Sequence, residues 1–154
     1  GYQPLDVIQI ESPQNLFAVV LHPQIEVKTS DARAVINPTV MLKDAITQWG
    51  NLGGFIAGLY TKDYALISRS LNDVIVEPFR KKLIPGFEDV KSIAIQSGAL
   101  GAGISGAGPS IFALCEGLNN AKKVAQNMKD NYLLNNIPFD LHISKINPNG
   151  IQTL

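Results

Sequence analysis

The sequence has a single cysteine, Cys115, so no disulfide can form within the chain. Cys115 lies in an apolar run, which favours a buried structural thiol over a nucleophile. There is also no excess of either charge, because 13 Lys and Arg balance 13 Asp and Glu. That balance argues against a broad electrostatic surface for nucleic acid or acidic membranes, which normally shows as a basic excess.

Long hydrophobic runs are absent as well. No apolar stretch approaches the ~20 residues that a membrane-spanning helix needs, and the N-terminus has no basic-then-apolar signal pattern. The two histidines, His22 and His142, have no metal-ligand spacing, so each is interpreted as a hydrogen-bonded strand-end or surface residue. We therefore expect no metal site, and the lone cysteine fits a cytoplasmic location.

The 154 residues are enough for one domain, and an apolar content of 45% allows a real core. We predict a single domain over residues 1–154. The chain starts at Gly1 without a methionine, which we interpret as a boundary inside a longer protein.

Apolar periodicity and turn residues predict the elements. A weak strand is expected at 5–10 and a central strand at 16–21. Helices are expected at 29–36, 42–59, 63–72 and 87–97, and a further helix is capped by Asn120. The remaining strands are predicted at 101–105, 110–115 and 139–144. This order predicts an α+β fold, a ferredoxin-like βαββαβ two-layer sandwich with extra helices in its first crossover.

Glycines and small residues dominate the stretch from Gly98 to Ser110, which leads into the apolar strand 111–115. Glycine reaches positive φ easily and allows close approach of another backbone or a ligand. Backbone N–H groups held in such a turn can face an anion. The plainer interpretation is a tight hairpin with no ligand, and for a generic glycine loop it is preferred.

The segment Gly-Ile-Ser-Gly-Ala-Gly-Pro-Ser at 103–110 resembles the third, C-terminal motif of the GHMP small-molecule kinases. Within that group, the chain resembles the homoserine kinases over nearly its whole length. The further residues that carry this resemblance, in family order, are His22-Pro23, the segment 27–33, the segment 73–80 and the segment 83–87. The resemblance implies the GHMP kinase C-terminal domain fold.

The resemblance also implies roles for particular residues. Arg33 and Arg80 would bind the carboxylate of L-homoserine, through the paired hydrogen bonds that a guanidinium can make. Thr29 would be a neighbouring polar contact, although a plain N-cap role is equally open. The glycine-rich residues that would line the active site are Gly103, Ser105, Gly106 and Gly108. Without the resemblance, both arginines would be interpreted as surface residues in ordinary ion pairs.

The two carboxylates near Arg80 in the sequence allow two interpretations. Asp73 and Glu77 would either orient Arg80 or act as exposed charges at a helix end, and the first is preferred.

No catalytic residue is predicted in this chain. The glycine-serine phosphate loop of the superfamily is not found in it, nor is a Walker motif.

The resemblance therefore implies the C-terminal, substrate-binding half of an ATP-dependent homoserine kinase of threonine biosynthesis. ATP and Mg²⁺ would be bound mainly by an absent N-terminal domain, and the isolated chain would be inactive. The expected partners are L-homoserine and that N-terminal domain, with a homodimer left open. The alternatives are a GHMP kinase for an isoprenoid precursor or a sugar, and a non-catalytic regulatory module that binds an amino acid.

Overall fold

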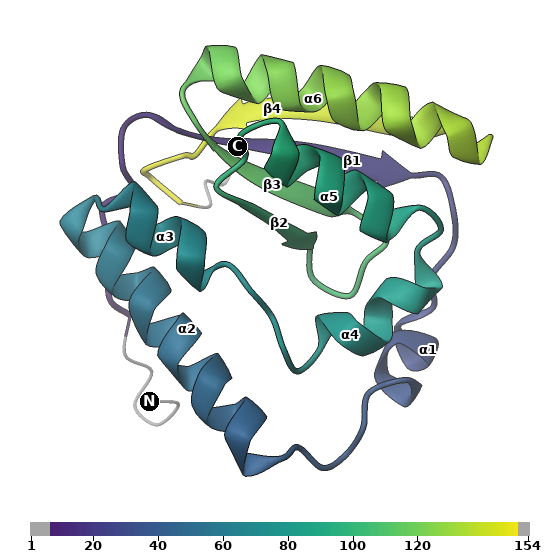
Figure 1. Ribbon diagram of the computed structural model, residues 1–154, viewed down its shortest axis with the longest axis horizontal. Helices are drawn as coiled ribbons and strands as arrows, with labels where there is room; N and C mark the ends of the chain where they lie inside the picture. Colours follow the sequence, from purple (N-terminus) through teal and green to yellow (C-terminus); the bar gives the residue numbers. More distant parts are fainter. Residues whose placement is uncertain (1–6, 151–154) are drawn as a thin grey trace.

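The computed structural model describes residues 7–150 (Figure 1). The elements are β1 (Leu16–Pro23), α1 (Thr29–Ala34), α2 (Leu42–Thr61), α3 (Tyr64–Ser70), α4 (Glu77–Arg80), a 3-10 turn (Lys81–Leu83), α5 (Phe87–Gln96), β2 (Gly101–Ile104), β3 (Ile111–Glu116), α6 (Leu118–Tyr132), a second 3-10 turn (Leu133–Asn135) and β4 (Phe139–Lys145).

The four strands form one antiparallel sheet in the order β2-β3-β1-β4. β1 lies in the centre because it is a continuous apolar run, paired with β3 on one side and β4 on the other. This order and the sequence of elements confirm the predicted α+β, ferredoxin-like sandwich.

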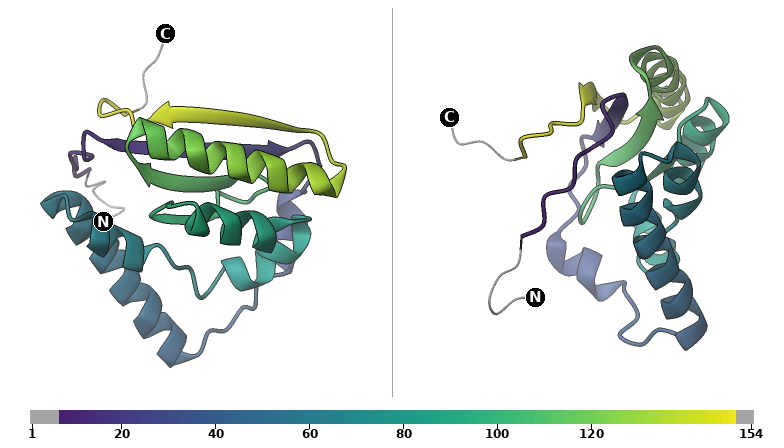
Figure 2. Two further views of the ribbon diagram at one scale, coloured as in Figure 1. Left: turned by 45° about the horizontal axis from the view of Figure 1, so that its top comes forward. Right: turned by 90° about the vertical axis from the view of Figure 1, so that its left-hand side faces the viewer.

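Helices α5 and α6 cover one face of the sheet, as the side views show (Figure 2). The core lies between them and the sheet, and residues such as Val19, Ala113 and Val124 are fully buried there. The side of α6 that faces the sheet is apolar, and its residues Ala121, Val124, Ala125 and Met128 are all buried. Gly98 follows α5 with φ +107, as expected for a glycine that ends a helix.

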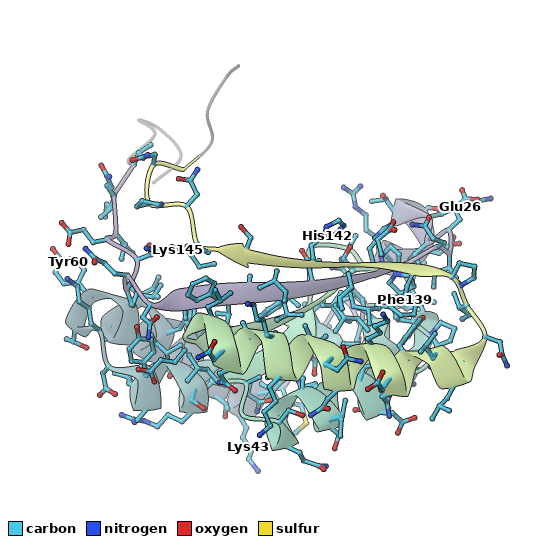
Figure 3. All side chains as sticks on the ribbon, turned by 90° about the horizontal axis from the view of Figure 1, so that it is seen from above. Glu26, Lys43, Tyr60, Phe139, His142 and Lys145 are labelled. Atoms are coloured by element: carbon cyan, nitrogen blue, oxygen red, sulfur yellow. The ribbon has the colours of Figure 1, made fainter. Side chains whose placement is uncertain are left out.

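Most of the side chains on the other face of the sheet are only half-buried or exposed. Val20, Phe112 and Leu114 lie on it, and His142 projects from β4 away from α6 (Figure 3). The register places Gly101 opposite Leu114 and Gly103 opposite Phe112, so both glycines of β2 belong to this face. A Cβ at Gly101 would lie 2.5 Å from Leu71 Cβ, which shows how closely the chain after α3 approaches β2.

The long crossover between β1 and β2 holds α1 to α4, and α2 and α3 pack together beyond the β2 edge of the sheet (Figure 1). Close packing against a neighbouring helix is the interpretation that the glycines of α2 favour. It is confirmed for Gly54 and Gly58, where a Cβ would meet Ser70 and Ile67 of α3. It is wrong for Gly50 and Gly53, because nothing lies within 4 Å of a Cβ built on either.

Several predicted boundaries differ from the structure. Residues 7–10 form no strand, and residues 5 and 6 lie outside the described part. The first helix ends at Ala34 rather than at residue 36, and Thr29 lies inside it, so Lys28 occupies the N-cap position. Asn120 does not cap α6, which begins after Gly117; its side chain donates to the carbonyl of Gly98 at 2.7 Å instead.

Cys115 is fully buried, and burial raises the pKa of its thiol to about 11. We expect a thiol reagent at pH 8 to label the native chain at least about tenfold more slowly than the unfolded chain. An ordinary thiol with a pKa near 8.5 is about one quarter thiolate at that pH, and Cys115 is almost entirely protonated. Equal labelling rates with and without denaturant would contradict the buried position.

Within residues 7–150, no helix is both long and apolar enough to cross a bilayer.

Candidate functional site

A pocket of about 240 Å³ lies where α2, the α3–α4 segment and the β2–β3 hairpin meet. Gln48 and Phe55 line it from α2, and Gly103 and Phe112 line it from the second face of the sheet. Gly103 is buried, and a Cβ there would lie 3.1 Å from Glu77 Oε2 and 3.2 Å from Phe112 Cε1. The glycines of β2 therefore make room for the pocket and for its wall.

Arg80 connects the pocket to two other parts of the chain. It ends α4, a short helix whose start is favoured by Pro78 in its first turn. Its Nε donates to the carbonyl of Ala32 in α1 at 3.0 Å, and its Nη1 donates to the carbonyl of Gly106 in the hairpin at 2.9 Å. A guanidinium has five N–H groups, so three remain after these two bonds. Arg80 also lines the pocket, where those groups can meet an anionic ligand.

Asp73 positions α4 through the backbone rather than through Arg80. Its carboxylate accepts from the N–H groups of Ile75 and Val76, each at 2.8 Å, and from that of Glu77 at 3.2 Å. The preferred interpretation, that Asp73 contacts and orients Arg80, is wrong. Asp73 shapes the turn from which α4 starts, so it acts on Arg80 only at a distance.

Glu77 does not orient Arg80 either, because its carboxylate is paired with Lys91 of α5. Only 12% of the Glu77 side chain and 15% of the Lys91 side chain are exposed. Burial raises the pKa of Glu77, and the ammonium of Lys91 opposes that rise. The pair joins α4 to α5, and so fixes the pocket wall to the core helix layer.

We expect Lys91→Met to lower the free energy of unfolding at pH 7 by about 2 kcal/mol, between the values typical of exposed and fully buried pairs. Without Lys91, the pKa of Glu77 should rise further above that of the unfolded chain. As pH falls, Glu77 of the folded variant then binds a proton at a higher pH than Glu77 of the unfolded chain. The stability of the variant therefore falls as pH rises through the raised pKa. Denaturant titrations should therefore show a deficit that is largest near pH 7 and shrinks below about pH 5. A deficit independent of pH would contradict this account of the pair.

Two amide side chains of α2 fix the loop before α4. Gln48 Oε1 accepts from the N–H of Val74 at 3.0 Å, and Asn51 Nδ2 donates to the carbonyl of Asn72 at 2.8 Å. Neither residue is among those predicted for the site. Their sequence signal is their spacing, because polar residues three apart share one face of a helix, here the face that also carries Phe55.

The glycine-rich segment forms the turn of the β2–β3 hairpin, and Ser105 and Gly106 are exposed there. The Ser105 N–H donates to the Ser110 carbonyl at 2.8 Å, and Gly106 and Gly108 have φ values of +61 and +88. His22 Nδ1 lies 2.8 Å from Ser110 Oγ, which confirms a hydrogen-bonded strand-end histidine. Gly103 and Gly106 line the pocket, whereas Ser105 and Gly108 belong to the turn beside it.

Arg33 and Thr29 lie on α1, outside the pocket lining, and both are exposed. α1 contacts the site through Ala32, the residue before Arg33. The carbonyl of Ala32 accepts a hydrogen bond from Arg80. The Arg33 side chain makes no hydrogen bond to the residues described here. Arg80 and the glycine hairpin are thus in one site, with Arg33 at its margin.

The residues do not fit a magnesium site by themselves. Within residues 7–150 no group of three His, Cys, Asp or Glu side chains could hold a metal ion. The two pocket carboxylates, Asp73 and Glu77, already accept from backbone N–H groups and from Lys91.

The family model described as "GHMP kinases C terminal" matches residues 55–133, which include α3 to α6 and the glycine hairpin. The chain belongs to this family. The predicted resemblance to the GHMP kinases is confirmed.

Relatives align with the whole of this chain. It is 48% identical to a homoserine kinase of Chlorobium phaeobacteroides over 156 residues, which is 100% of this chain and 49% of that protein. The crystal structure of a homoserine kinase from Cytophaga hutchinsonii superposes with a TM-score of 0.93 at 49% identity, over 96% of this chain and 47% of that one. The chain thus spans about half the length of the relatives it matches.

More distant structures share the fold alone. A mevalonate kinase from L. major superposes with a TM-score of 0.68 at 15% identity, over 88% of this chain and 44% of that one. The sandwich is therefore common to kinases with different substrates.

Proposed function

We propose that this chain is the C-terminal, substrate-binding half of a homoserine kinase, which transfers the γ-phosphoryl group of ATP to the hydroxyl of L-homoserine. The observation that carries the proposal is the alignment of the whole chain with homoserine kinases at 48–49% identity. The position of Arg80 in the pocket supports it, because a guanidinium is suited to the carboxylate of an amino acid.

In this proposal Arg80 binds the substrate carboxylate with the N–H groups that Ala32 and Gly106 leave free. The two carbonyls hold the guanidinium in one orientation, which reduces the entropy lost when substrate binds. Arg33 and Thr29, next to Ala32 on α1, contact the same carboxylate from the exposed side. Arg33 has no competing partner among the described residues, so it is free to turn toward the ligand.

Gly103, Ser105, Gly106 and Gly108 form the floor of the cleft in the same proposal. Phe112 and Phe55 give the pocket apolar walls against which the short carbon chain of homoserine can pack. ATP and Mg²⁺ are held mainly by an N-terminal half that precedes Gly1. This chain therefore positions the substrate, and the other half supplies the phosphate-binding loop.

The test is a substrate panel on the full-length protein, assayed for ADP formation with L-homoserine, mevalonate, phosphomevalonate and galactose. We expect turnover with L-homoserine alone. The isolated 154-residue chain should give no turnover with any of them, and should bind ATP no more tightly than millimolar. Preference for an isoprenoid precursor or a sugar would overturn the proposed substrate. Turnover by the isolated chain would overturn the proposed division between the two halves.

A further inference from the structure

His22 lies near the end of β1, on the second face of the sheet and outside the pocket lining. Its neighbours Leu21 and Pro23 are fully buried, so the backbone of His22 is fixed within the central strand. The register places Leu21 opposite Ile111, which brings His22 beside Ser110 at the end of the hairpin turn. The imidazole ring is therefore carried by a rigid part of the core and reaches the turn.

A hydrogen bond joins these two side chains, which are far apart in the sequence. His22 Nδ1 and Ser110 Oγ are 2.8 Å apart, and both residues are half-buried. A serine hydroxyl can donate or accept, so it can pair with Nδ1 in either tautomer of the ring. The bond therefore forms in both tautomers, and partial burial limits competition from water.

The hairpin turn, residues 105–110, is packed at one end and open at the other. A Cβ at Gly108 would lie 3.1 Å from Ile84 Cδ1, whereas no described atom lies within 4 Å of a Cβ at Gly106. Within residues 7–150, two hydrogen bonds of side chains tie the turn to other elements, one from Arg80 and one with His22. The position of Gly106 therefore depends on these bonds more than on packing.

Internal hydrogen bonds make the turn move as a unit. The Ser105 N–H donates to the Ser110 carbonyl at 2.8 Å, and the Gly108 N–H donates to the Ser105 carbonyl at 3.0 Å. A shift of Ser110 is therefore passed on to Gly106, whose carbonyl accepts from Arg80 Nη1 at 2.9 Å. The orientation of that guanidinium thus depends on where Ser110 is held.

We propose that His22 is a positioning residue of the site. Through Ser110 it holds the hairpin turn where the Gly106 carbonyl keeps the Arg80 guanidinium in place beside the pocket. His22 acts through these residues, because it does not itself line the pocket in the described part of the chain. The consequence for substrate binding rests on the proposed function, whereas the hydrogen bonds from β1 to the turn and from the turn to Arg80 do not.

The KM for L-homoserine of the full-length protein gives the first test. His22→Ala should raise it about five- to tenfold, the range of one neutral hydrogen bond, and should leave kcat within about twofold. The carboxylate is remote from the reacting hydroxyl, so its binding contributes alike to the ground state and the transition state. An unchanged KM for homoserine in His22→Ala would overturn the proposal.

His142→Ala is the matched control for every measurement on His22→Ala. His142 is an exposed histidine on the same face of the sheet, opposite Val20 of β1 (Figure 3). Its replacement should leave both kinetic constants near those of the wild type. An equal rise of the KM in His142→Ala and His22→Ala would show a general effect of the sheet face and overturn the proposal.

Replacement by the two amides separates the Nδ1 contact from a loss of volume. An asparagine amide can take the place of Nδ1, whereas a glutamine amide lies one bond further out, near the place of Nε2. We therefore expect His22→Asn to keep most of the affinity for homoserine and His22→Gln to behave like His22→Ala. Ser110→Ala should reproduce His22→Ala, and the double variant should be no worse than either one. Additive effects, or better rescue by glutamine than by asparagine, would contradict the contact.

A positioning role also requires that the effect pass through Arg80. In the Arg80→Ala background, His22→Ala should cause no further loss of kcat/KM for homoserine. With 3-aminopropan-1-ol, which lacks the carboxylate, His22→Ala should match the wild type. A merely structural defect would lower both activities alike, so an undiminished effect with the analogue or in Arg80→Ala would overturn the proposal.

Hydrogen exchange of the hairpin separates this inference from the proposed function. In mass spectrometry of the full-length protein, the slow amides of the turn, within the peptide 101–112, should exchange about five- to tenfold faster in His22→Ala than in wild type or His142→Ala. Unchanged exchange in His22→Ala would overturn the inference whatever the substrate. A wild type that does not phosphorylate homoserine would overturn the proposed function, and the exchange rates would still decide whether His22 holds the turn.

Discussion

Replacing Arg80 with alanine in the full-length protein is expected to lower kcat/KM for L-homoserine by about 10- to 100-fold. A charge-assisted hydrogen bond contributes roughly 1.5–3 kcal/mol, and each 1.36 kcal/mol corresponds to a tenfold change in rate. The substitution also removes the bonds to the carbonyls of Ala32 and Gly106, so α1 and the hairpin lose their shared contact. The KM for ATP should change far less, because the nucleotide is proposed to bind the other half.

Arg69→Ala is the matched control, since Arg69 is an exposed arginine of α3 outside the pocket lining. It should leave both kinetic constants near those of the wild type. Arg80→Lys should recover little activity, because an ammonium cannot span two carbonyls and a carboxylate as a guanidinium does. Near-normal homoserine kinetics in Arg80→Ala would refute the role of Arg80 in substrate binding.

Gly101→Val is expected to cost about 3 kcal/mol or more of folding stability. The added Cβ would lie 2.5 Å from Leu71 Cβ, an atom next to the backbone that cannot swing away. Relief requires the α3–α4 segment to move off β2, and overpacking of a fitted site typically costs 1–3 kcal/mol, occasionally more. Because that segment carries Arg80, the variant should also lose affinity for homoserine.

Gly50→Val is the control for this prediction. Nothing lies within 4 Å of a Cβ at Gly50, and valine is a slightly better helix former than glycine, so stability should rise by a few tenths of a kcal/mol. Denaturant titration of both variants gives the comparison. Similar effects at the two positions would show that α3–α4 does not rest on β2 as described.

Much of the fold could be predicted from local patterns. The apolar run of β1, the glycine turn, the strand that begins at Ile111 and the alternation in β4 each carry their own period, and all are confirmed. Of the predicted site, Arg80 and Gly106 lie in one pocket, and their roles in binding substrate stay predictions. Arg33 and Thr29 lie at its margin, and their role in binding substrate stays a prediction.

The errors come from information that a linear pattern lacks. Periodicity indicates that Trp49 and Ile56 share a face of α2, but not that this face points away from the chain. Glu77 stands three residues before Arg80, yet it pairs with Lys91 of a helix later in the chain. Asn120 has good capping chemistry but is used for the carbonyl of Gly98. Each outcome depends on a tertiary neighbour, which overrides local preference.

The central claim is that Arg80 holds the carboxylate of the substrate, and substrate truncation tests it most directly. Full-length wild type and Arg80→Ala would each be assayed with L-homoserine and with 3-aminopropan-1-ol, which lacks the carboxylate. The wild type should prefer homoserine by at least about 100-fold in kcat/KM, and Arg80→Ala should lose at least about tenfold of that preference, because the lost contact is the one the analogue never makes. An undiminished preference in Arg80→Ala would contradict the account.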